Sequence, residues 1–123
     1  MNQIESVVAN VFPEHPLIPT FPHAPFGWTP RDAARRAREE GITLTRMHWE
    51  EIRGLQEYFA RHQGAPRINL REIHDALEEH FHTRGGIERL YELFPGGPVA
   101  QGCRLAGLKA PYMASDPSYG TVA

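Results

Sequence analysis

From Trp28 onward, residues that start a helix alternate with residues that end one, and this alternation constrains the fold more than any other feature. Thr29 can cap a helix, and Pro30 suits the first helical position. Asp32 then lies where a negative charge stabilises the helix dipole. Gly41 is typical of a helix end. The same signals recur along the chain and predict helices over residues 29–41, 45–63, 69–82, 87–94 and 98–107.

Apolar side chains within these segments recur at helical rather than strand spacing. Ile73, Leu77 and Phe81, for example, share one face of a helix over 69–82. No alternating strand pattern is present beyond what the first 12 residues contain. The sequence therefore predicts a mainly α protein, a compact bundle of about five helices with helix-turn-helix-like packing.

Both ends of the chain differ from this helical part. Prolines recur every third residue between 11 and 26, which favours an extended arm that packs its aromatic residues on the body, although a polyproline II ligand has the same spacing. A short β-hairpin is a further alternative for this region. After Leu108 the periodicity stops. We expect an N-terminal arm over 1–27, a helical domain over 28–108 and a mobile tail over 109–123.

Composition excludes several classes of protein. A chain of 123 residues suits one domain, and its formal charge of −2 does not favour nucleic acid or anionic membrane. No apolar run reaches membrane length. Cys103 is the only cysteine, so an internal disulfide cannot form, and a reducing compartment such as the cytoplasm is expected.

Several motifs occur in a fixed order between Trp28 and Pro111, and together they are far more specific than any one alone. These motifs are Glu40-Gly41-Ile42-Thr43-Leu44-Thr45, His48-Trp49-Glu50, Ala65-Pro66-Arg67, Leu90-Tyr91-Glu92-Leu93-Phe94-Pro95, Gly97-Pro98, and the set Gln101, Cys103, Arg104, Ala106, Gly107, Leu108 and Pro111. In this order they resemble the DsrC/TusE family of sulfur-relay proteins.

The resemblance implies a sulfur-relay function with one part missing. Members of the family carry sulfur on a penultimate cysteine of a mobile tail, and DsrC-type members add an inner cysteine that corresponds to Cys103. Ala114 stands at the position of the outer cysteine. We therefore expect an accessory or regulatory family member that acts through protein contacts. The implied partners are sulfite-reductase-type or sulfur-transferase proteins. The predicted binding residues are Arg67, Tyr91, Phe94, Arg104 and Lys109.

Cys103 itself has two interpretations. As a reactive thiol it would be a single-thiol persulfide carrier or a redox sensor, and this role requires exposure and a cation such as Arg67 or Lys109 to favour the thiolate, since the adjacent Arg104 does not share its helix face. As a small apolar residue it would be buried in the core, like most free cysteines. The residues alone leave both interpretations open.

The sequence favours three further classes of function less: a DNA-binding regulator, a metal-binding protein and a stand-alone enzyme. The helices over 69–82 and 87–94 also suit a helix-turn-helix DNA-binding regulator, although acidic residues on both helices oppose phosphate contacts. The seven histidines lack the spacing of a metal site. No nucleophile motif or phosphate-binding loop is present, so we expect neither a cofactor nor a stand-alone enzyme.

Overall fold

The structure is a computed structural model that describes residues 20–63 and 68–111. Within these ranges the chain is helical and contains no strand, so the prediction of a mainly α bundle is confirmed. Part of the predicted N-terminal arm, most of the tail, Arg67 and Ala114 lie outside the described residues. The elements are α2 (Pro30–Glu39), α3 (Arg46–Arg61), α4 (Leu70–His80), the 3₁₀ turn η1 (His82–Arg84), α5 (Gly86–Leu93) and α6 (Ala100–Ala106).

The predicted starts of α2 and α4 are correct because local side chains cap them. Asp32 N–H donates to Thr29 Oγ1, and Thr29 N–H donates back to Asp32 Oδ2 at 2.8 Å, which is a reciprocal capping box. Asn69 accepts from the first backbone N–H groups of α4 in the same way. Other predicted helix boundaries are less accurate. The segment predicted over 69–82 stops at His80 and passes into η1, and α6 begins two residues after Pro98.

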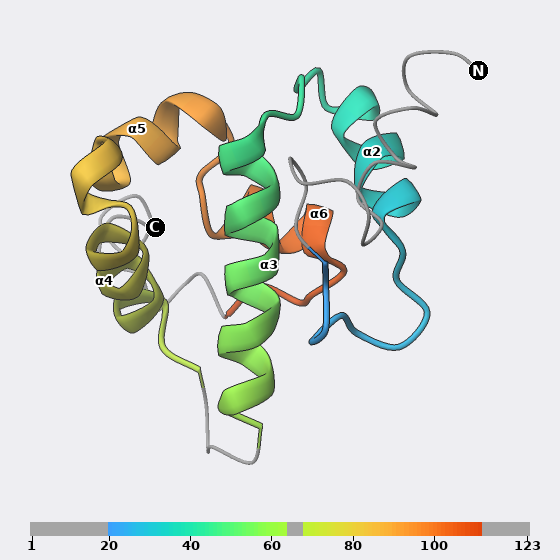
Figure 1. The fold of residues 1–123 in the computed structure, drawn as a ribbon, viewed down its shortest axis with the longest axis horizontal. Helices are drawn as coiled ribbons and strands as arrows, with labels where there is room; N and C mark the ends of the chain where they lie inside the picture. The colour runs from blue at the N-terminus through green and yellow to red at the C-terminus, as the bar shows by residue number, and fades with distance from the viewer. Residues whose placement is uncertain (1–19, 64–67, 112–123) are drawn as a thin grey trace, which may run out of the picture.

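Helix α3 runs through the middle of the molecule, with α2 and α6 on one side and α4 and α5 on the other (Figure 1). Helix α6 packs on both α2 and α3, and α4 packs on η1 and α5. Two clusters of buried side chains result. One joins α2, α3 and α6 around Trp49 and Phe94, and the other joins α3, α4, α5 and α6 around Leu55 and Phe81. Helices α3 and α6 contribute side chains to both clusters.

Candidate functional site around Cys103

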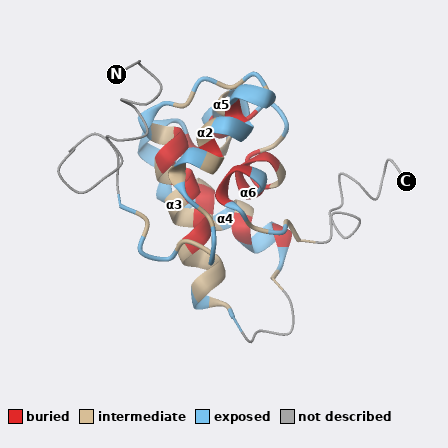
Figure 2. Ribbon diagram, turned by 90° about the vertical axis from the view of Figure 1, so that its right-hand side faces the viewer, coloured by how far each residue is buried: buried red, intermediate tan, exposed pale blue. Residues whose placement is uncertain are grey.

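Cys103 lies in the second cluster with no exposed surface. Helix α6 is short, yet five of its seven residues are buried, as the red stretch of α6 in Figure 2 shows. Leu55, Leu77 and Val99 belong to the same cluster as the thiol. The exposed acceptor thiol that the single-thiol carrier requires is therefore absent, because the helix turns this side chain into the core. Cys103 is buried in the core, as the second interpretation of the sequence expects.

Burial raises the pKa of the Cys103 thiol to about 12, and the nearby Glu51 carboxyl adds to the increase. Arg104 lowers this pKa, but its effect is smaller than that of burial. A pKa near 12 leaves roughly one thiol in 10⁵ ionised at pH 7. Since the thiolate is the reactive form, Cys103 is a poor nucleophile in this conformation.

Glu51 is the least expected feature of the site. This α3 side chain is fully buried, and within the described residues neither carboxylate oxygen has a hydrogen-bond partner. Its carboxylate packs directly over Gly102, where a side chain would collide with it. Burial raises the pKa of Glu51 well above its ordinary value. The protonated, uncharged form is thus the one that the fold favours beside Cys103.

Side chains from other elements hold the C-terminal end of α6. Trp28 Nε1–H donates to the Leu105 carbonyl at 2.8 Å, and Gln56 Nε2 donates to the Ala106 carbonyl at 3.0 Å. The last carbonyls of a helix have no partner within it, so these bonds satisfy groups that would otherwise be buried unpaired. They fix α6 to α3 and to the segment before α2.

The exposed side of α6 is tied to the end of α2 by Glu40. Arg104 donates to both Glu40 oxygens at 2.9 Å, and Gln101 Nε2 donates to Oε1 at 2.8 Å. These donors, with Arg104 contributing most, lower the pKa of Glu40 to about 2. The Gln101 side chain also accepts from Gly96 N–H at 2.9 Å. Arg104 therefore holds α6 in place rather than activating the thiol.

His48 connects α3 to the motif that precedes α6. Its Nδ1 accepts from Thr45 N–H at 2.9 Å, so Nε2 carries the proton and donates to the Leu93 carbonyl at 2.7 Å. The ring also packs on Phe94, with centroids 4.7 Å apart. Burial lowers the pKa of His48, which keeps the imidazole neutral. His48 therefore caps the start of α3 and packs against Phe94.

The predicted binding residues that the structure describes differ in exposure. Phe94 is fully buried, so it serves the core and cannot contact a partner in this conformation. Tyr91 is 47% exposed and lies beside His74 of α4, and Lys109 is exposed after α6. Arg67 lies outside the described residues. Roles of Tyr91, Arg104 and Lys109 in partner binding stay predictions.

Two arginines of the DNA-binding alternative already form ion pairs. Arg84 pairs with Glu50, and Arg89 pairs with Glu92 at 2.7 Å. Cations engaged in this way are less available to phosphates. In the described part of the chain, no group of three His, Cys, Asp or Glu side chains has the geometry of a metal site. None of the described helices combines the length and apolar character needed to cross a membrane.

Comparison with known proteins agrees with the order of the motifs. The sequence profile of the DsrC-like proteins matches residues 20–114. The chain belongs to the DsrC-like family. Sulfurtransferase TusE of Photorhabdus laumondii is 34% identical over 84 residues, which cover 68% of this chain and 75% of the relative. Sulfurtransferase TusE of Salmonella typhimurium is 36% identical over 85 residues, covering 68% and 76%. No solved structure shows significant similarity to the chain.

Sequence reasoning missed the polar side chains that fix α6 in this DsrC-like chain, above all Glu40, Glu51 and Gln56. A signal for Glu51 was present, because it lies one turn before Leu55 on the apolar side of the helix. Periodicity gives the face of a residue but not its depth. Only the packing of α6 on that face shows that the carboxyl is covered.

Proposed function

We propose that this chain is an accessory or regulatory member of the DsrC-like family, which acts through protein contacts in sulfur relay and carries no sulfur on a thiol of its own. The observation that supports this function is the full burial of Cys103, the only cysteine in the sequence. A carrier thiol must meet its donor and its acceptor in turn, and a thiol without exposed surface meets neither.

The family relationship supports sulfur-transferase proteins as the partners. The relatives are named sulfurtransferase TusE. From the family resemblance we expect the carrier cysteine of such proteins at the position of Ala114. A chain that keeps the docking surface but lacks this cysteine would occupy a partner without passing sulfur on. A sulfite-reductase-type partner is the other expectation from the resemblance. The lone, reduced cysteine suits the cytoplasm, where such relays would operate.

The test measures whether the chain accepts sulfur. The purified protein and its Cys103→Ser variant are incubated with a persulfidated sulfur donor, and intact mass is recorded. The TusE of Salmonella typhimurium serves as the positive acceptor. We expect no added sulfur on either form of this chain. Sulfur on the wild type that disappears in Cys103→Ser would make Cys103 a carrier and overturn the proposal.

The variant Ala114→Cys is the matched control for the missing cysteine. It returns a thiol to the position that the resemblance assigns to the carrier. We expect this variant to gain sulfur under the conditions in which the wild type does not. Failure of Ala114→Cys to gain sulfur while TusE does would show that position 114 is not equivalent to the carrier position.

A competition experiment tests the regulatory part of the proposal. Wild-type chain is added in increasing amounts to the donor and TusE, and the rate of sulfur addition to TusE is measured. Occupation of the donor by this chain would slow that rate. An unchanged rate at a large excess would exclude competition for the donor, and it would leave the absence of sulfur on Cys103 unaffected.

A further inference from the structure

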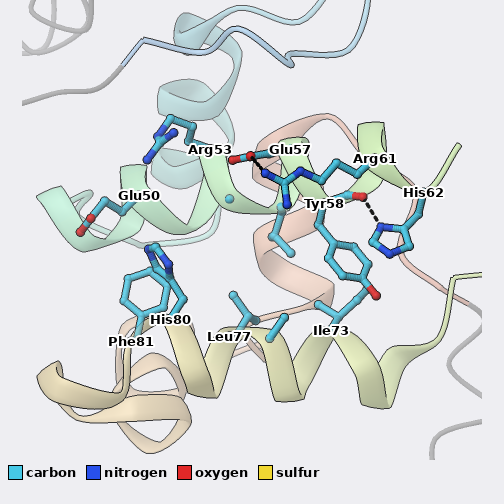
Figure 3. Close-up of a pocket in the computed structure, with 13 residues that line it drawn as sticks. Glu50, Arg53, Glu57, Tyr58, Arg61, His62, Ile73, Leu77, His80 and Phe81 are labelled. Carbon is cyan, nitrogen blue, oxygen red and sulfur yellow. Dashed lines mark hydrogen bonds and ion pairs between the residues drawn. The ribbon is translucent and has the colours of Figure 1, made fainter.

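Helices α3 and α4 enclose a groove on the side of the molecule away from α2. They run side by side in opposite directions, and their facing side chains line the space between them (Figure 3). The groove has a volume of about 450 Å³, within the range of ligand-binding clefts. Its floor is apolar and comprises Leu55, Ile73, Ala76, Leu77 and Phe81.

Gly54 leaves open space in the α3 wall of this groove. It lies in the interior of α3 and lines the groove, and a Cβ added there would meet nothing within 4 Å. Glycine inside a helix costs about 1 kcal/mol relative to alanine, so its presence needs a reason other than helix stability. The missing side chain lets another chain approach the α3 backbone closely.

The charge of the lining is the second observation. Glu57 is paired with Arg61 at 2.6 Å, and Glu50 is paired with Arg84. Arg53 lines the same groove, and its Nε is buried with no hydrogen-bond acceptor among the described residues. No described carboxylate forms an ion pair with Arg53. The carboxylates are thus neutralised, and one guanidinium is left to receive a negative charge.

Length and shape indicate what fills the groove. Its α3 wall extends from Glu50 to His62, which is about 18 Å or roughly three helical turns. Extended peptides are usually bound along a free strand edge, and the described residues contain no strand. A groove between two helices instead accepts the ridge of a third helix.

We propose that the α3–α4 groove binds an acidic amphipathic helix of a partner protein. Apolar side chains of that helix, spaced at i, i+3 or i+4 and i+7, fill the floor and pass over Gly54. A glutamate or aspartate of the helix accepts hydrogen bonds from Arg53. This site deepens the proposed function, because it names a surface and a partner chemistry for a chain that acts through protein contacts.

The test uses the full chain and a synthetic probe. The probe is a fluorescein-labelled helical peptide of glutamate, alanine and leucine with leucines at the spacing given above, and binding is measured by fluorescence anisotropy at low salt. We expect saturable binding. A peptide with lysine in place of each glutamate, and a scrambled peptide of the same composition, should bind at least about tenfold more weakly.

Two variants locate the binding. Arg53→Gln removes the free charge and should weaken binding by about tenfold. Gly54→Leu fills the groove at a position with open space and should abolish binding, while circular dichroism checks that the helices are intact. Arg38→Gln on α2 is the matched control, since Arg38 is exposed and far from the groove lining, and it should leave affinity unchanged.

Several outcomes would overturn the site. The site would be wrong if the acidic probe did not bind, if the lysine probe bound equally well, or if folded Gly54→Leu bound the acidic probe as tightly as the wild type. Displacement of the probe by a synthetic peptide of residues 112–123 would show that the occupant is the chain's own C-terminal segment rather than a partner. These failures would leave the sulfur experiments unchanged, whereas sulfur on Cys103 would overturn the proposed function and leave the groove in place.

Discussion

The two faces of α3 are built in opposite ways. Toward α6, Gly102 is covered so closely by Glu51 and Leu55 that no Cβ fits. Toward α4, Gly54 faces open space. Both are helical glycines, yet one is required by packing and the other leaves room unfilled. In this chain the family's cysteine motif lies in the tightly packed region, whereas the space for a partner lies in the other.

The largest effect should come from filling the tight side. Gly102→Val places a Cβ against the Glu51 carboxylate and 2.8 Å from Leu55 Cδ1, so helix α6 must move away from α3. We expect a loss of about 3 kcal/mol in the free energy of unfolding, measured by urea denaturation. Gly54→Val is the matched control and should change stability by less than about 0.5 kcal/mol. Equal losses at both glycines would remove the contrast between the two faces.

The buried carboxyl offers the next test. Because the pKa of Glu51 is raised in the folded state, its neutral form is favoured there, and stability is lost as pH rises above the unfolded pKa toward the folded one. Glu51→Leu removes this loss and should stabilise the protein at pH 7 by about 2 kcal/mol. Unfolding free energies of both proteins should converge as the pH approaches 4. A wild type whose stability is level between pH 4 and 8 would contradict the buried, protonated state.

The contribution of Glu40, on the exposed side of α6, to the stability of the fold should be lost in acid rather than in base. The pKa of Glu40 is lowered from 4.5 to about 2, so its contribution is complete above about pH 4.5 and is lost as pH falls toward 2. Glu40→Gln should cost only about 1 kcal/mol at pH 7, since Arg104 is 44% exposed and water screens the pair. The difference between variant and wild type should shrink in acid, as followed by thermal unfolding between pH 2 and 6.

The smallest effect is expected on the open side. Gly54→Ala adds a methyl group that meets no atom and improves helix propensity, so stability should rise by about 0.5 to 1 kcal/mol. The same methyl group enters the groove only slightly and should weaken the peptide probe less than Gly54→Leu does. Destabilisation by Gly54→Ala would show that the groove is not open in solution.

The sequence by itself determined where α2 and α4 begin and which family the chain resembles. Thr29 with Asp32, and Asn69 before α4, act on backbone groups within three residues, so local rules identify them. The cysteine motif could also be recognised from the sequence, because the order of its residues along the chain does not depend on distant contacts. The helix ends were less predictable, since η1 after α4 depends on how that segment packs against α5.

Only the tertiary structure decided what these residues can do. Whether Cys103 is a reactive thiol or a core side chain depends on α3, which contributes Glu51 and Leu55 from some fifty positions earlier in the chain. Arg104 is adjacent to the cysteine in sequence, but its guanidinium is bound by Glu40 at the end of α2. Burial and charge pairing are properties of neighbours in space. Periodicity gives the face on which a side chain lies, but the packing of a second helix sets its solvation and therefore its chemistry.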